Sequence, residues 1–144
     1  MLLHTYLKSG IAYVPTVAKL TTGAYLDVDP VAVESVANVA GLRRGLLEAS
    51  DRKNPVISPP PKGKWPSPVL LKYAGVKSWS AFARGASMWS IDEDQGNYQI
   101  IGYRDHPDGY WARDPDQITN FPTGTKIDVV IDRMISILQQ AARR

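Results

Sequence analysis

The chain of 144 residues contains no cysteine, only two histidines and no long apolar run. Without cysteine, disulfide bonds and thiolate metal sites are excluded, and a reducing cytoplasm is the natural compartment. No apolar stretch approaches the roughly 20 residues that a membrane-spanning helix needs. The first eight residues are too few and too polar for the core of a signal peptide. We therefore expect a cytoplasmic protein without a membrane anchor.

What is present is typical of a folded globular protein. Hydrophobic residues make up 44% of the chain and charged residues 22%, which argues against disorder. A chain of this length is one ordinary domain, long enough to bury a core. We expect a single domain over residues 1–144.

Charge is sorted along the sequence. Residues 43–84 carry nine Lys or Arg against two carboxylates, a net of +7, whereas residues 85–132 carry nine carboxylates against three Lys or Arg, a net of −6. The overall charge of +3 hides this division, and ten of the thirteen aromatic residues fall between Trp65 and Phe121. The pattern indicates a charged binding surface rather than a catalytic pocket.

The N-terminal third predicts strands. Residues 11–20 are rich in β-formers and end at the turn signal of residues 21–23, residues 24–29 alternate apolar and polar side chains, and residues 31–36 are a candidate third strand. Pro15 and Pro30 cannot donate to a ladder, so these strands should lie at an edge or break at the prolines.

A helix is predicted over residues 38–50, with Asn38 as its N-cap. Gly41 and Gly45 each weaken it by about 1 kcal/mol relative to alanine. Packing must therefore hold this helix, or the glycines allow another element to approach closely. A last helix is predicted to open at Thr125, with Asp128 near the N3 position of a capping box. Its apolar residues repeat at helical spacing and form one stripe, namely Ile127, Val130, Ile131, Met134, Leu138 and Ala141.

Between the helices, residues 51–68 form a loop with six prolines, which is stiff rather than floppy. Its Trp65 is either an interface hot spot or a lid over the core. Residues 69–73 fit a helix entered at Ser67-Pro68 or a strand, and Ser78 can cap a short helix over residues 79–86 that packs Trp79 and Phe82 inward.

A meander of three antiparallel strands follows. Residues 88–92 and 98–103 flank a loop with Gly96, residues 105–109 form the next turn, and residues 110–113 form the third strand. Residues 114–116 are interpreted as another turn. The fold class is therefore α+β, with an antiparallel sheet packed against two main helices, residues 38–50 and the C-terminal one.

Residues that could carry chemistry are few. His4 is expected in a mobile N-terminus, and His106 lies among turn residues, where a solvated histidine is favoured over a general base. The spacing of Asp92, Asp94 and Gly96 imitates a calcium loop, but Tyr103 stands where the bidentate glutamate belongs. We expect no metal, no cofactor and no catalysis. A small hydrolase that uses His106 with Asp105 or Asp108 remains a third alternative.

One basic segment interleaves cations with aromatic residues, a combination that can bind single-stranded nucleic acid. Core packing and a protein interface are the favoured alternatives to that interpretation. The segment comprises Lys72, Tyr73, Lys77, Trp79, Phe82 and Arg84.

Residues 69–86, the hairpin over residues 89–103 and the Pro122-Thr123-Gly124-Thr125 segment resemble a group of single-domain bacterial proteins. These are the immunity proteins of contact-dependent growth-inhibition and related polymorphic toxin systems, and the resemblance extends from about Val31 onward. It implies a non-catalytic protein that binds and neutralises a toxin. Because such proteins bind through variable surfaces, the resemblance transfers no site residue. Inhibitors of nuclease toxins are often acidic overall, whereas this chain is basic.

Two surfaces are predicted to bind the toxin. The first is an acidic hairpin tip with the neighbouring turn, which would enter the basic cleft of a nuclease. Its residues are Asp92, Glu93, Asp94, Asp105 and Asp108. The second is the basic segment with Trp65, represented by Lys72, Lys77 and Arg84. The alternative function is a nucleic-acid-binding accessory protein. No membrane partner is expected, and the oligomeric state stays open.

Overall fold

The computed structural model describes residues 1–107 and 109–144. Its elements in chain order are β1 (Leu2–Lys8), β2 (Ile11–Leu20), β3 (Tyr25–Ser35), α1 (Val39–Arg52), β4 (Val56–Ile57), α2 (Leu70–Ala74), α3 (Trp79–Ala83), β5 (Ala86–Asp94), β6 (Asn97–Asp105), β7 (Trp111–Asn120) and α4 (Ile127–Ala142). One sheet has the order β3-β2-β1-β5-β6-β7, with β4 paired to β2. All its pairings are antiparallel except that of β2 with β4. The predicted α+β class is confirmed.

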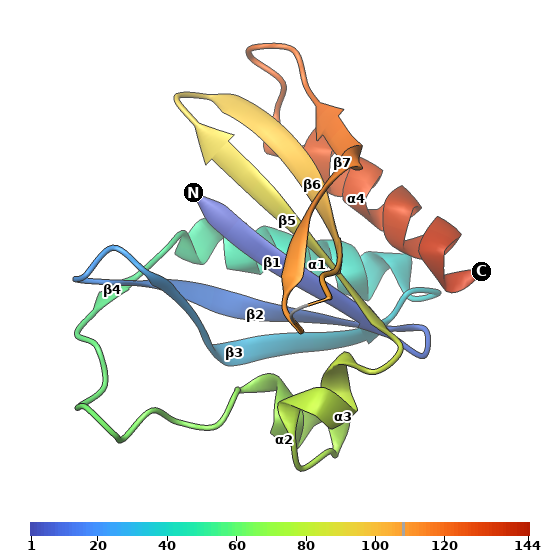
Figure 1. The fold of residues 1–144 in the computed structure, drawn as a ribbon. Coiled ribbons are helices and arrows are strands. Elements are labelled where there is room, and N and C mark those ends of the chain that lie inside the picture. Colours follow the sequence, from blue (N-terminus) through green and yellow to red (C-terminus); the bar gives the residue numbers. More distant parts are fainter. Residues whose placement is uncertain (108) are drawn as a thin grey trace.

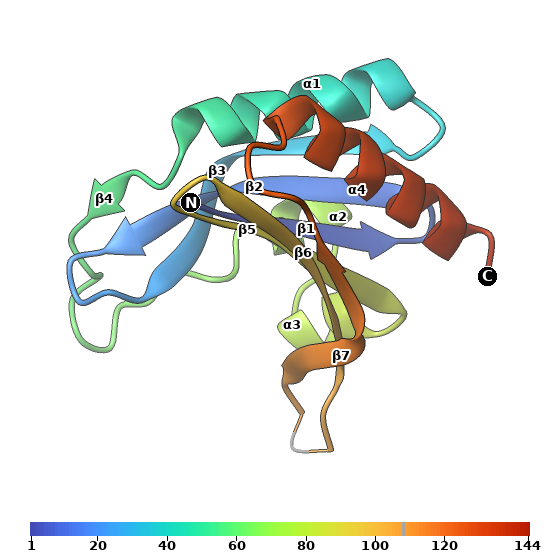
Figure 2. The same ribbon diagram turned by 90° about the horizontal axis from the view of Figure 1, so that it is seen from above.

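The helices lie on both faces of the sheet but cover them unequally. Figures 1 and 2 show the long helices α1 and α4 on one face and the short helices α2 and α3 on the other. We call the first the helix-covered face and the second the open face. The main core lies under α1 and α4. A smaller cluster on the open face joins Tyr6 and Tyr13 to Leu70, Leu71 and Phe82.

Helix α1 agrees with its prediction. The Asn38 side chain accepts a hydrogen bond from the Gly41 backbone N–H at 3.1 Å and caps the first turn. A Cβ built on Gly45 would lie 2.8 Å from the Cβ of Ala32 in β3. The absent side chain therefore lets α1 approach the sheet closely, which confirms the second of the two explanations for these glycines.

The N-terminus departs from its prediction. Residues 2–8 form β1, which lies between β2 and β5 in the middle of the sheet, so the expectation of a mobile segment is wrong. Leu3, Thr5 and Leu7 are buried on the helix-covered face, while His4 and Tyr6 point to the open face. This alternation identifies a half-buried strand.

Strands β1 and β2 separate at one end, and Asn54 fills the gap between them. Their direct pairing runs only from Tyr6 opposite Tyr13 to the turn. Farther along, the Asn54 side chain accepts from the Leu2 backbone N–H at 2.9 Å and donates to the carbonyl oxygens of Leu2 and Val17, both at 2.8 Å. One side chain thus provides hydrogen bonds that the sheet ladder lacks there.

The prolines of the first strands occupy the positions that their chemistry predicts. Pro30 lies in β3, an edge strand, and Pro15 lies where the β2–β3 register shifts. The two strands expected over residues 24–36 are instead one strand, β3.

Several local predictions needed correction. The proline-rich segment is not entirely a loop. Helix α1 continues into it as far as Arg52, and the short strand β4 within it pairs with β2. Residues 70–74 adopt the helical alternative, and Ser78 caps α3 as expected, although α3 ends at Ala83. Phe82 is fully buried, whereas Trp79 is 37% exposed, so only one of the two packs fully inward.

The C-terminal half shows the predicted meander with two differences. Residues 114–116 do not form a separate turn but belong to β7, beside a register shift against β6. The capping box is also wrong, because the Thr125 hydroxyl donates to the Pro122 carbonyl and α4 begins after Lys126 without a side-chain cap. The apolar stripe of α4 is confirmed by its buried residues Val130, Ile131, Met134, Ile135 and Leu138.

Candidate interaction site on the open face of the sheet

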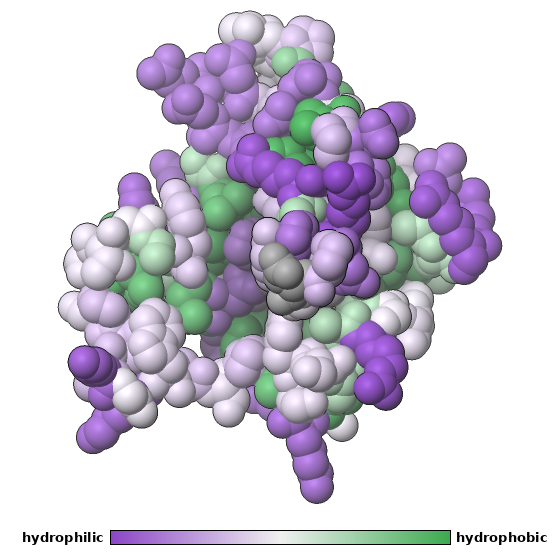
Figure 3. All heavy atoms as spheres, in the orientation of Figure 1, coloured by the Kyte–Doolittle hydropathy of each residue, from purple (hydrophilic) through white to green (hydrophobic). Residues whose placement is uncertain are grey.

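Several open-face positions of the central strands carry polar side chains. In β1 these include His4 and Tyr6, and in β5 they are Ser90 and Asp92. His4 stands directly opposite Ser90 in the antiparallel register, so both project to the same face. The core residues occupy the alternate positions. The face that lacks long helices is therefore mixed in polarity, because Ser90 is fully buried and Tyr6 belongs to the smaller apolar cluster. Figure 3 shows hydrophilic and hydrophobic residues interspersed over this side of the molecule.

A hydrogen-bonded cluster of three residues joins β1 to β3. Oδ1 of Asp27 lies 2.7 Å from Nδ1 of His4. Oδ2 of Asp27 accepts a hydrogen bond from the Tyr6 hydroxyl at 2.6 Å. The His4 and Asp27 side chains are 16% and 18% exposed. Burial, together with the negative charge of Asp27 and its hydrogen bond, raises the pKa of the Tyr6 hydroxyl well above its usual value. Tyr6 therefore stays a neutral donor to Asp27.

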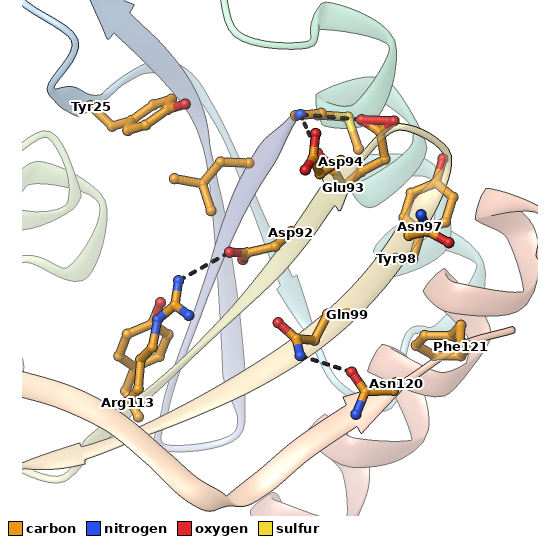
Figure 4. Close-up of a pocket in the computed structure, with 13 residues that line it drawn as sticks. Tyr25, Asp92, Glu93, Asp94, Asn97, Tyr98, Gln99, Arg113, Asn120 and Phe121 are labelled. Carbon is orange, nitrogen blue, oxygen red and sulfur yellow. Dashed lines mark hydrogen bonds and ion pairs between the residues drawn. The ribbon is translucent and has the colours of Figure 1, made fainter. Parts of the chain in front are cut away.

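A second cluster surrounds Asp92 on β5. Asp92 accepts from the Ser90 hydroxyl at 2.6 Å and from the Arg113 guanidinium at 3.3 Å. The Ser90 hydroxyl also lies 3.2 Å from the hydroxyl of Tyr103 on β6. Figure 4 shows Arg113 directed toward Asp92 across the sheet. Asp92 is thus held by Ser90 of its own strand and by Arg113 of β7.

Two hollows lie over these clusters. The larger groove has a volume of about 820 Å³, and three carboxylates and one arginine are among its lining side chains, namely Asp92, Glu93, Asp94 and Arg113. The second, which we call the Asp27 pocket, has a volume of about 460 Å³ and is lined by His4, Tyr6, Tyr25, Leu26, Asp27, Pro66, Ser67, Pro68, Val69, Leu70 and Trp79. Tyr25 lines both, so the two hollows are neighbours on one surface.

An arm made of α2, α3 and the preceding loop borders the Asp27 pocket. Lys72 of α2 pairs with Asp29 of β3 at 2.6 Å, and the Tyr73 hydroxyl donates to the same carboxylate. The hydrogen bond from Lys72, followed by that from Tyr73, lowers the pKa of Asp29. On α3, the rings of Trp79 and Phe82 lie edge to face against the Tyr6 ring of β1, with ring centroids 6.1 and 5.9 Å apart. The arm is therefore tied to β3 by charge and to the sheet by aromatic contacts.

Comparisons with known proteins bear on the fold of this chain. A scan against protein-family models and a search of curated proteins find no match. Among solved structures, a Neisseria meningitidis protein of unknown function is similar, with a TM-score of 0.65 and 11% sequence identity over 97% of this chain and 92% of that one. That likeness establishes the fold alone.

The predicted acidic surface is only partly brought together. Glu93 binds the Met1 amino group at 3.2 Å and accepts a hydrogen bond from the Gly96 backbone N–H at 3.2 Å. The hydrogen bond from Gly96 contributes most to lowering the pKa of Glu93, followed by the contact with the Met1 amino group. Asp94 is exposed beside Asp92. Asp105 lies at the opposite end of β6 from Asn97 at the hairpin tip. At the rise of about 3.3 Å per residue in a strand, the two ends are about 26 Å apart. The structure therefore separates Asp105 from the tip, which corrects the idea of one acidic surface. Asp108 lies outside the described residues.

The predicted basic residues are spread over the arm. Lys72 is engaged with Asp29, and Lys77 lines a further hollow of about 500 Å³ with Asp29 and Pro68. Arg84 caps the end of α3, and its carbonyl oxygen accepts a hydrogen bond from Lys8. Trp65 is 56% exposed in the proline-rich loop, so it does not form a lid over the core.

Sequence reasoning missed the residues at the centre of the open face. His4, Tyr6 and Asp27 come from strands 21 to 23 residues apart in the chain, so only the sheet register brings them together. The alternation of residues 2–8 was the one signal that could have placed His4 and Tyr6 on a common face.

The described part of the chain contains neither a cluster of metal-binding side chains nor a membrane-spanning helix. Over residues 1–107 and 109–144, no three His, Cys, Asp or Glu side chains gather closely enough to hold a metal ion. The Asp92 carboxylate is instead used by Ser90 and Arg113. No helix in those same residues is both long and apolar enough to cross a membrane.

Proposed function

We propose that this protein is an immunity protein that binds and neutralises a bacterial protein toxin and has no catalytic activity of its own. The observation that carries the proposal is the acidic and aromatic open face, where the larger groove and the Asp27 pocket adjoin at Tyr25. The proposal also draws on the resemblance of residues 69–103 and 122–125 to immunity proteins of polymorphic toxin systems.

The charge of this face favours a basic partner. Asp92 and Asp94 line the larger groove, and Asp27 lines the adjoining pocket. Arg113 is the only Lys or Arg among the described lining residues of the two hollows, and it is already paired with Asp92. A toxin that acts on nucleic acid must bind phosphates, so its cleft is basic and complements such a surface.

Exposed aromatic residues around the hollows favour a protein as the partner. Trp65 is 56% exposed and Tyr25 is 44% exposed. Large rings of this kind supply contact area at little cost in conformational entropy, and they are enriched at protein interfaces. A basic protein surface carrying apolar groups therefore fits both properties of the open face.

The proposal places the acidic contact on fewer residues than the sequence did. We assign it first to the exposed Asp94, with Asp92 and Asp27 as less exposed carboxylates held by neighbouring side chains. The Met1 amino group pairs with Glu93 and offsets its charge. The basic arm with Lys77 and Trp65 would contact the toxin at the rim of the groove.

A protection assay tests this function. If the gene immediately upstream encodes a large secreted protein with a variable C-terminus, that C-terminal domain is expressed in a test bacterium with and without the chain, and growth is measured. We expect growth only when the chain is present, and the charge reversal Asp94→Lys should weaken protection while the opposite-face variant Asp132→Lys should not. Growth arrest despite stable expression of the chain would refute the proposal.

The nucleic-acid alternative has a separate test. Lys72 is paired with Asp29, whereas Lys77 and Arg84 of the predicted segment form no ion pair with the described residues. Fluorescence anisotropy with labelled single-stranded RNA at rising salt would reveal a nucleic-acid binder through affinity that falls steeply with salt. We expect no such binding.

A further inference from the structure

The Asp27 pocket combines apolar walls with one carboxylate. Its walls are formed by Leu26, Val69 and Leu70 together with the prolines of the arm, and its polar groups come from the cluster of His4, Tyr6 and Asp27. A pocket of this kind, mostly apolar with a few convergent polar groups, is the usual form of a specific binding site.

Among the described residues, Asp27 pairs with no Lys or Arg, and none lines the pocket. Two cations of the arm are occupied or lie elsewhere, since Lys72 pairs with Asp29 and Lys77 lines the adjoining hollow. When His4 is neutral and donates its Nδ1–H to Asp27, the cluster carries one negative charge.

The cluster retains acceptor capacity toward the pocket. Each Asp27 oxygen receives one hydrogen bond, while a carboxylate can accept about four. In the neutral tautomer described above, the second ring nitrogen of His4, Nε2, is also an acceptor. Among described residues it has no hydrogen-bonding partner. These acceptors suit a ligand that carries several N–H donors.

Two aromatic rings stand at the walls. Tyr25 is 44% exposed, and Trp79 is 37% exposed although it stacks on Phe82. Aromatic faces attract cations, and the planar guanidinium group of arginine combines such stacking with paired hydrogen bonds to a carboxylate. Its aliphatic stem would lie against Val69 and Leu70.

We infer that the Asp27 pocket binds an arginine side chain of the partner protein, held by Asp27 and His4 and flanked by Tyr25 and Trp79. This inference rests on the proposed function, because it names the chemistry by which the open face would anchor a basic toxin. Asp27 then determines that an arginine side chain is bound, whereas Asp94 at the rim acts through its exposed charge.

The test uses the whole chain and a small probe, so it does not require the toxin. Nα-acetyl-arginine amide is titrated to about 100 mM into the ¹⁵N-labelled protein at constant ionic strength, and amide and indole shifts are followed by NMR. The matched control ligand is Nα-acetyl-citrulline amide, which has nearly the same shape without the charge. We expect saturable shifts at the Trp79 indole and at Tyr25 and Leu26, with at least about fivefold weaker binding of the citrulline compound.

Variants sharpen the assignment. Asp27→Asn should abolish the preference for arginine over citrulline, while Asp132→Asn on α4 should leave it unchanged. If Asp27→Asn fails to fold, Trp79→Ala, which alters an exposed ring, should still weaken arginine binding. Equal binding of both compounds, or shifts confined to Asp92 and Asp94, would overturn the inference. Because protection is measured separately, a failure here with intact protection would reject only the arginine pocket.

Discussion

Asn54 should contribute more to stability than its half-buried position in a loop indicates. Its side chain makes three hydrogen bonds to the backbones of β1 and β2, at 2.8 to 2.9 Å. Asn54→Ala removes all three and leaves one N–H and two carbonyl groups without these partners. At about 1 kcal/mol for each net hydrogen bond, the expected loss is about 3 kcal/mol. Water reaching the site would reduce this to no less than about 2 kcal/mol.

Urea denaturation followed by circular dichroism measures the loss. The midpoint should fall while the slope of the free energy against urea stays unchanged, because the extent of surface exposed on unfolding is the same. Asn54→Asp provides a control of the same shape, since it keeps an acceptor for Leu2 N–H but brings a carboxylate against two carbonyl groups. It should be at least as destabilising as alanine. A loss below about 2 kcal/mol for Asn54→Ala would refute the idea that this side chain joins the two strands.

Three further predictions concern the core and the open face. Gly45→Ala should destabilise the fold by about 1 to 2 kcal/mol in urea melts, because its Cβ would lie 2.8 Å from that of Ala32. This loss should appear despite the higher helix propensity of alanine, and adding Ala32→Gly should restore stability. Thr5→Val should raise stability by about 1 kcal/mol in the same assay, since the buried Thr5 hydroxyl has no hydrogen-bonding partner among the described residues; a lower midpoint would contradict this. Because burial and Asp27 raise the pKa of Tyr6, the folded state holds its proton longer than the unfolded state, so stability should fall as pH rises above about 10, by up to about 1.4 kcal/mol per pH unit. Tyr6→Phe should show a shallower decline over that range, and an identical pH profile would exclude Tyr6 as the cause.

The sequence predicted best those elements whose signal lies within the element itself. Helix α4 was located by its apolar period, and the start of α1 by Asn38. The β5–β6 hairpin was indicated by Gly96, which with Gln95 forms the loop at positive φ. In each case local periodicity or turn chemistry agrees with the tertiary structure.

Elements whose signal is weak or contradictory were misassigned. Strand β1 is short and begins at the chain end, so its alternation was outweighed by the general mobility of termini. Pro115 and its flanking aspartates favour a turn, yet β7 continues through them at the sheet edge, where a missing N–H is tolerated.

The candidate site could not be predicted because it depends on register between distant strands. The sequence located Asp92 and Asp94 correctly at a hairpin end, but it could not show that Arg113 would bind Asp92 or that the N-terminus would bind Glu93. Asp27 had no signal of its own, since it occupies a polar position in an alternating strand. Its interest arises only from the contacts with His4 and Tyr6.

The alternation along β1 has a consequence for how this protein can evolve. Codons 3, 5 and 7 encode side chains buried against the long helices, while codons 4 and 6 encode side chains on the open face. Selection for the main core therefore acts on codons that alternate with those of the open face. A substitution at codon 4 can alter the open face while the core under α1 and α4 stays intact, whereas codon 6 also encodes Tyr6 of the smaller buried cluster.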